Sequence, residues 1–162
     1  MTGSSSGRAS FRPDVQGLRA IAVALVVVYH VWPALLPGGY VGVDVFFVIS
    51  GYLITALLVR EIESSGSISF SAFYARRARR LLPASLLTLA TILLAAVVLV
   101  PRMFWREIGT DVASAALYAS NWWFHSKALD YLAQGEAPGP VQHFWSLSIE
   151  EQFYFIWPLV ML

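Results

Sequence analysis

Residues 81–100 read LLPASLLTLATILLAAVVLV, an apolar stretch without a charged residue that is followed by Pro101 and Arg102. A helix needs about 20 mostly apolar residues to cross the hydrocarbon core of a bilayer. The stretch therefore predicts a membrane-spanning helix. Pro83 would fall in its first turn, where the missing N–H costs little.

Three further apolar stretches flank this one. The first covers residues 19–36, where Arg19 leads into an apolar run that is broken only by His30; the second covers 41–59, and the last, 144–162, is still apolar at Leu162. Each has a length that suits a span. We therefore predict an all-α fold, a polytopic integral membrane helical bundle with about four spans that is truncated within the fourth.

The composition agrees with a membrane protein. Apolar residues make up 57% of the chain, charged residues only 13%, and the mean hydropathy is +0.63. A soluble chain is about 25% charged and about 45–50% apolar. The net charge of +1 gives no case for nucleic acid. Because the chain has no cysteine, disulfides, thiolate metal sites and a cysteine acyl-enzyme are excluded, and we expect no metal site.

Residues 102–142 have a different pattern, in which apolar side chains recur at helical spacing opposite Arg106, Glu107 and Asp111. The apolar positions are Phe104, Ile108, Val112, Ala115, Ala116 and Ala119. The pattern predicts an amphipathic helix that lies at an interface or on other helices. A loop rich in glycine and proline, Gln134–Gln142, follows it. Trp122, Trp123 and Trp145 suit an interfacial aromatic belt.

The basic residues predict the orientation, because cytoplasmic segments carry the excess of lysine and arginine. Eight arginines lie in the N-terminal tail and the 60–80 segment, against three basic residues in 101–143. We therefore expect a cytoplasmic N-terminus, a cytoplasmic 60–80 segment and an outward-facing 101–143. Residues 1–10 are small and polar and predict a disordered tail before a membrane domain over 11–162.

His30 is an ionisable side chain inside the first predicted span. Such groups are costly in a membrane and usually face a cavity or a partner. Imidazole is also well suited to take a proton from a hydroxyl near neutral pH. Arg19 lies eleven positions earlier, on nearly the same helix face and about 16 Å away along the axis. The alternatives are a packing role for His30 and simple membrane anchoring for Arg19.

A cluster of arginines precedes the third predicted span. Arg77 and Arg80 are three positions apart and share a helix face, with Arg76 beside them. Guanidinium groups match phosphate oxygens with two parallel hydrogen bonds, and a helix start favours anions. The sequence therefore predicts an anion site here. The alternative is that the cluster sets topology and binds lipid headgroups.

Glu150 opens the fourth predicted span and shares one face with Ser146 and Tyr154. A carboxylate at this depth could pair with a cation of another helix or position a hydroxyl substrate. It could also lie at headgroup level, favoured by the helix dipole. Ser50 and Gly51 lack the Gly-x-Ser-x-Gly surroundings of a serine nucleophile, so we interpret them as helix packing positions. Asp44 could cap the second predicted helix or pair with a charge across the pocket, and the sequence does not decide between these roles.

Four stretches combine these residues in a fixed order. They are QGLRAIA (16–22) followed by His30, GYVGVDVFFVISGY (39–52), FYARRARRLLP (73–83) and HFWSLSIEEQFY (143–154). Together, over about residues 11–158, they resemble the signatures of the acyltransferase-3 family of membrane O-acyltransferases. Many members have an acidic residue where this chain has Gln16, so the acidic partner of a local salt bridge is missing.

The resemblance implies transfer of an acyl group, acetyl above all, from acyl-CoA to a hydroxyl of an extracytoplasmic glycan such as surface polysaccharide, lipopolysaccharide or peptidoglycan. It implies that His30 is the general base, that Arg19 holds an anionic group or orients its helix, and that Glu150 has a functional role. It also implies that the arginine cluster Arg76, Arg77 and Arg80 binds the donor phosphates. Acyl-CoA would be a substrate, and no cofactor is expected to be bound.

The resemblance further implies a bacterial inner membrane protein. Full members have about ten spans, often with a C-terminal SGNH domain, so this chain would need the remaining part of the same protein and is not expected to be active alone. Two other classes stay open. A transporter fragment would show broken helices and a repeat relating its halves, neither of which is evident. A non-catalytic membrane scaffold would keep the motifs for packing.

Overall fold

The computed structural model describes residues 12–129 and 139–162, and this part of the chain is helical without a strand. The predicted all-α class is confirmed. The helices are α1 (Pro13–Val31), α2 (Val41–Ser65), α3 (Phe70–Leu99), the short 3-10 helix η1 (Arg102–Phe104), α4 (Trp105–Ala116), α5 (Ser120–Leu129) and α6 (Phe144–Val160). The predicted tail 1–10 and most of the predicted loop Gln134–Gln142 lie outside the described residues.

All four helices that correspond to predicted spans differ from them in their bounds, and α2 continues to Ser65 rather than ending at residue 59. α1 begins at Pro13 and ends at Val31 rather than covering 19–36, because proline suits the first helical position and Pro33 disfavours helix in the residue before it. α3 begins at Phe70 rather than at residue 81. Pro83 therefore lies in the interior of α3, not in its first turn as predicted. α6 ends at Val160 rather than continuing to residue 162.

Among the described helices, α1, α2 and α3 are long and apolar enough to cross a membrane. α6 has 17 residues and is not one of them. At 1.5 Å per residue its length is about 25 Å, which is short for the hydrocarbon core of a bilayer. The fourth span therefore stays a prediction.

The chain divides into two compact units, one up to Thr55 and one from Ala56 onward. In the first unit, α1 and the beginning of α2 form an antiparallel pair. Arg12, just before α1, donates a 3.1 Å hydrogen bond to the Tyr52 hydroxyl of α2. At the other end of the pair, the rings of Tyr29 and Tyr40 meet edge to face with centroids 5.9 Å apart.

Two glycines let the backbones of this pair come very close. A Cβ added to Gly39 would lie 2.5 Å from the carbonyl oxygen of Leu25, and one added to Gly42 would lie 2.5 Å from that of Ala22. Gly51, where we predicted close packing, has no described atom within 4 Å of an added Cβ. The close approach within this unit therefore occurs at Gly39 and Gly42, and packing at Gly51 stays a prediction.

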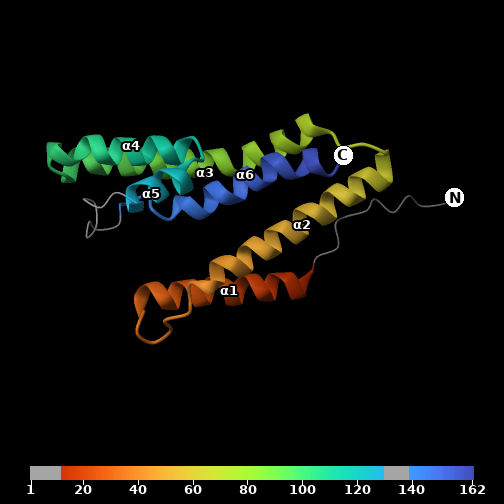
Figure 1. Ribbon diagram of the computed structural model, residues 1–162, viewed down its shortest axis with the longest axis horizontal. Helices are drawn as coiled ribbons and strands as arrows, with labels where there is room; N and C mark the ends of the chain where they lie inside the picture. The colour runs from red at the N-terminus through yellow and green to blue at the C-terminus, as the bar shows by residue number, and fades with distance from the viewer. Residues whose placement is uncertain (1–11, 130–138) are drawn as a thin grey trace. The chain divides into compact units, whose positions relative to one another are not determined.

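In the second unit, α4 and α6 run antiparallel to α3, each beside a different part of it (Figure 1). α4 begins beside the end of α3, where the Trp105 indole N–H donates to the carbonyl of Val100 at 3.0 Å. α6 extends toward the beginning of α3, where the Phe155 ring lies 5.8 Å from that of Tyr74. The two shorter helices thus follow α3 along most of its length.

The core of this unit joins α3 to α4 and α6. Leu89, Val112, Ala115, Val141 and Phe144 form a buried cluster, with Ile92, Ile108, Phe124 and Leu147 packed against it. α4 is amphipathic, as its pattern predicted. Its apolar face packs along the apolar surface of α3, so of the two predicted placements, at an interface or on other helices, the described contacts show the second.

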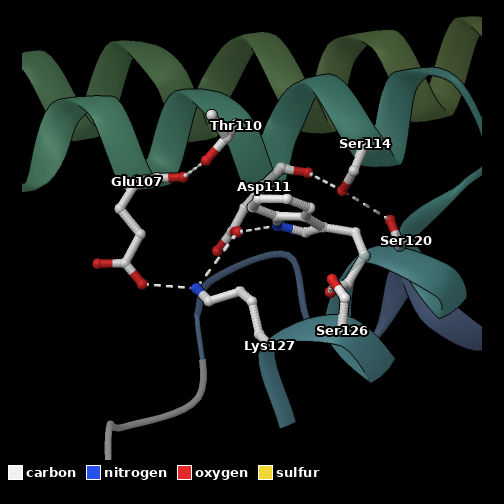
Figure 2. A network of polar contacts seen from close by, with 8 residues as sticks. Glu107, Thr110, Asp111, Ser114, Ser120, Ser126 and Lys127 are labelled. Carbon is white, nitrogen blue, oxygen red and sulfur yellow. Dashed lines mark hydrogen bonds and ion pairs between the residues drawn. The ribbon is translucent and has the colours of Figure 1, made fainter. Parts of the chain in front are cut away.

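Asp111 departs from its predicted place on the polar side of α4, because it is only 1% exposed. Its carboxylate accepts a 2.7 Å hydrogen bond from the Trp123 indole and lies 3.5 Å from the Lys127 ammonium. Lys127 also contacts Glu107 at 2.6 Å, and Figure 2 shows the acidic pair of α4 facing this lysine of α5. Trp123 therefore joins α5 to α4 rather than serving only as an interfacial residue.

Candidate functional site

His30 lies exposed in the last turn of α1, with its Nδ1 atom 2.8 Å from the carbonyl oxygen of Val26. A carbonyl oxygen only accepts hydrogen bonds, so Nδ1 carries the proton in this contact. In the neutral imidazole the lone pair is then on Nε2. The contact therefore selects the tautomer that presents a basic nitrogen away from the helix backbone.

The helix pair supports this histidine from one side. The Tyr29 ring packs edge to face on the His30 ring, with centroids 5.5 Å apart. The side chain of Val26 lies against Gly42, where an added Cβ would be 2.7 Å from Val26 Cγ2. The turn that carries both the His30 side chain and its acceptor is thus held by the close approach of α2.

Arg19 lies on the same helix as His30 and is half-buried. Among the described residues it has no ion pair. Asp44 is exposed in the first turn of α2. The structure thus brings Arg19 and His30 onto one continuous helix, as the sequence predicted, and both roles stay predictions.

Arg77 has partners that the sequence did not predict. Its Nη2 lies 2.5 Å from Oε1 of Glu151 on α6, and both side chains are half-buried. Its guanidinium carbon lies 3.4 Å from the centre of the Tyr154 ring. The Tyr154 hydroxyl in turn donates a 2.6 Å hydrogen bond to Glu150. Arg77 and Glu150, both predicted site residues, are therefore linked through Tyr154.

The other arginines of the cluster are more exposed. Arg76 lies 3.6 Å from Glu61, and Arg79 donates to the carbonyl of Ala75 in its own helix at 3.2 Å. Arg80 is exposed and has no ion pair within the described part of the chain. Of the three predicted donor-binding residues, Arg80 is thus the one with a guanidinium that is not engaged by a described carboxylate.

A cavity of about 420 Å³ lies between α3, the α4–α5 turn and α6. Arg77, Glu151, Gln152 and Tyr154 form a polar wall, and most of the remaining lining residues are apolar or aromatic, such as Leu81, Leu117 and Phe155. The pairing of Arg77 with Glu151 offsets the two charges at this wall. The cavity therefore suits a mainly apolar group that carries a neutral polar end.

Sequence reasoning missed Glu151 and Gln152, which lie next to the predicted Glu150. Gln152 makes hydrogen bonds to Tyr118 and Asn121, and Glu151 pairs with Arg77. The sequence signal for them was the run of three consecutive polar residues, Glu150 to Gln152, in an otherwise apolar helix. Such a run points in three directions around the helix, so at least two of its side chains must face neighbouring helices.

The pKa of Lys127 reflects its place between two carboxylates. Burial lowers it, but the hydrogen bond that Lys127 donates to Glu107 and the charge of Asp111 outweigh burial and raise the pKa above its usual value. The ion pairs of Lys127 therefore link α5 to α4, and they involve none of the residues that contact Arg77.

Comparison with known proteins identifies the chain. The acyltransferase domain of the acyltransferase-3 family matches residues 12–162, nearly the whole chain. The chain belongs to the acyltransferase-3 family. This membership and the three long apolar helices make it part of an integral membrane protein.

Named relatives of this acyltransferase-3 chain occur in Staphylococcus aureus. The O-acetyltransferase OatA of strain NCTC 8325 / PS 47 is 43% identical over 151 residues, which cover 93% of this chain and 25% of that protein. OatA of strain COL gives the same values. The chain thus spans about a quarter of the length of these relatives. No solved structure matches it.

Proposed function

We propose that the chain is the N-terminal part of a membrane enzyme that transfers an acetyl group from acetyl-CoA to a hydroxyl of an extracytoplasmic glycan. Membership of the acyltransferase-3 family and the relatives named O-acetyltransferase support this proposal. The enzyme would lie in a bacterial inner membrane with its N-terminus in the cytoplasm. The arginine-rich start of α3 would then face the donor, and the remaining helices of the same protein would complete the site.

The observation that carries the proposal is the hydrogen bond between His30 and Val26. It leaves Nε2 of His30 as the proton acceptor. In the proposed step Nε2 of His30 takes the proton of the acceptor hydroxyl, while the oxygen of that hydroxyl attacks the acyl carbon of acetyl-CoA. A C–O bond forms, the C–S bond to CoA breaks, and the proton passes from His30 to the departing thiolate. General base catalysis of this kind contributes about 10²–10⁴-fold in rate.

On the donor side, Arg80 is the most accessible arginine of the cluster. Arg77 is occupied by Glu151 and Tyr154, and Arg76 lies near Glu61. We therefore assign the CoA phosphates first to Arg80, with Arg76 beside it. Arg77 would hold α6 in place, and through Tyr154 it would help to fix Glu150.

The transporter alternative predicts broken helices. α4 and α6 lie along different parts of α3, with α5 between them in the chain, so the helical path that follows α3 is interrupted. No internal repeat accompanies the interruption, although a repeat is the second sign expected of a transporter. The family match favours the acyltransferase reading, because it covers the interrupted segment together with the helices that carry His30 and Arg77.

The test restores the full-length protein in a host that lacks glycan O-acetylation of its own, and measures ester-linked acetate on the surface glycans. Acetate that depends on the protein would support the proposal. If the protein reaches the membrane and a panel of surface polysaccharide, lipopolysaccharide and peptidoglycan stays free of ester-linked acetate, the proposal is wrong. The same panel would show which glycan is the acceptor.

A further inference from the structure

Gln152 uses its whole side-chain amide in contacts with the turn between α4 and α5. Its Nε2 donates to the carbonyl of Tyr118 at 2.7 Å and to Asn121 Oδ1 at 2.9 Å. Its Oε1 accepts from Asn121 Nδ2 at 3.2 Å. Both N–H groups and the oxygen are thus engaged. Only an amide can donate twice and accept once in this geometry.

The turn that Gln152 holds is strained. Tyr118 has a φ of 52°, and it is the one residue other than glycine in the described part of the chain with a positive φ. Such a conformation costs about 1–3 kcal/mol and persists only where the surroundings enforce it. Asn121, in the first turn of α5, completes the bonded pair. Gln152 therefore fixes α5 and the end of α4 against α6.

Two neighbouring faces of α6 are held by different helices. One face carries Gln152 and, one turn earlier, Ser148, whose hydroxyl accepts a 3.3 Å hydrogen bond from the backbone N–H of Ser120. The next face, about 100° around the helix, carries Glu151 with its ion pair to Arg77 of α3. Contacts on two faces fix the rotation of α6 about its own axis.

That rotation decides where Glu150 points. Glu150 precedes Glu151 by one position and so lies on a third side of α6, where it accepts the hydrogen bond from Tyr154. We propose that Gln152 is a positioning residue for the acyl transfer, because its amide contacts to Tyr118 and Asn121 set the rotation of α6 that presents Glu150. The proposal rests on the proposed function for its kinetic part only.

The kinetic test uses the full-length enzyme with Gln152→Met, which keeps the length of the side chain and removes the amide. A misplacement of about 1 Å can cost about 10²-fold in rate. We expect kcat to fall by about ten- to a hundredfold while the KM for acetyl-CoA changes less than about twofold. Gln142→Met, at an exposed glutamine before α6, is the matched control and should keep the wild-type kcat.

A double-mutant cycle asks whether Gln152 acts through Glu150. In a Glu150→Gln background, Gln152→Met should lower kcat by less than about twofold, because the carboxylate that it positions is already gone. Effects of the two substitutions that multiply would overturn the proposal, as would a wild-type kcat in Gln152→Met. The exchange Asn121→Gln with Gln152→Asn, which retains an amide pair, should recover part of the rate.

A second readout does not depend on activity. Residues 1–162 contain no cysteine, so Glu150→Cys adds the one thiol of this part of the full-length protein, and its labelling with a maleimide in membranes is followed on the peptide that contains position 150. Adding Gln152→Met should change the labelling rate at position 150 by about threefold or more, whereas adding Gln142→Met should not. An unchanged rate would overturn the positioning role even if Gln152→Met is too unstable for kinetics. A wild-type enzyme without transferase activity would contradict the proposed function and leave this labelling result valid.

Discussion

Arg77 on α3 and Glu151 on α6 are 74 positions apart in the chain, yet their side chains form an ion pair with 2.5 Å between Nη2 and Oε1. The pair is half-buried, and the Tyr154 ring covers the guanidinium. An arginine that the sequence marked for binding an external anion is thus paired inside the protein. Its first contribution is to hold α6 against α3.

Glu151→Gln should therefore destabilise the protein, because it leaves the Arg77 charge half-buried without its carboxylate. A hydrogen bond between charged groups contributes about 1.5–3 kcal/mol, so we expect a loss of this size in the free energy of unfolding. Thermal unfolding of the full-length protein in detergent measures it. Arg79→Gln is the control, since within residues 12–129 and 139–162 the Arg79 side chain bonds only to a carbonyl of its own helix. Equal melting temperatures for wild type and Glu151→Gln would contradict the assigned role.

Arg80 and Arg77 should differ in what they affect. Arg80→Gln is expected to raise the KM for acetyl-CoA several-fold with little change in melting temperature, because its exposed guanidinium is available to phosphate. Arg77→Gln should lower the melting temperature instead. Steady-state kinetics with purified enzyme, together with thermal unfolding, separates the two. A KM unaffected by Arg80→Gln would show that the donor phosphates bind elsewhere.

The close approach of α1 and α2 predicts a sharp difference between two glycines. Gly42→Ala would place a methyl group 2.5 Å from the carbonyl oxygen of Ala22. Overpacking of this kind costs about 1–3 kcal/mol. Gly51→Ala meets no described atom and should be neutral or stabilise by up to about 1 kcal/mol through helix propensity. Membrane yield and melting temperature of the two variants test this, and a Gly42→Ala protein as stable as Gly51→Ala would refute the close approach.

The packing of α4 along α3 predicts a pattern of chemical accessibility. Met103, in η1, lies at the turn after α3, and Leu117, after the end of α4, lines the cavity with Leu81; both side chains are exposed in the structure, so a bilayer around α3 is what would distinguish them. The twelve positions from residue 105 to 117 carry α4 about 18 Å back along α3. If α3 crosses the bilayer, an impermeant maleimide added outside should label Met103→Cys and not Leu117→Cys. Labelling of both at the same rate would instead place all of α4 outside the membrane, as the sequence pattern alone suggests.

The sequence was a good guide to elements that depend on local composition. The three long apolar helices follow from their hydrophobic runs, and the amphipathic character of α4 follows from its 3.6-residue period. Helix ends were less accurate where a proline decides them, as Pro33 does for α1. Pro83 was misplaced because α3 begins well before the apolar run, in a segment where arginines are good helix formers.

The contacts of the site were harder to predict because they join residues far apart in the chain. The motif around Glu150 indicated that this helix carries function, but pattern alone could not show that Glu151 pairs with Arg77 or that Gln152 binds Tyr118. Asp111 shows the same limit. An acidic residue beside other charged residues is typical of a solvated face, and only the positions of Trp123 and Lys127 on α5 explain its burial.

The central claim is that Nε2 of His30 accepts the proton of the acceptor hydroxyl, and His30→Gln tests it most directly. The glutamine amide can still donate to the carbonyl of Val26, but it has no basic nitrogen. With purified full-length enzyme and acetyl-CoA, kcat should fall at least about 100-fold. His125→Gln, at an exposed histidine of α5, should keep the wild-type rate. A His30→Gln enzyme that retains the wild-type kcat would make His30 a packing residue and contradict the account.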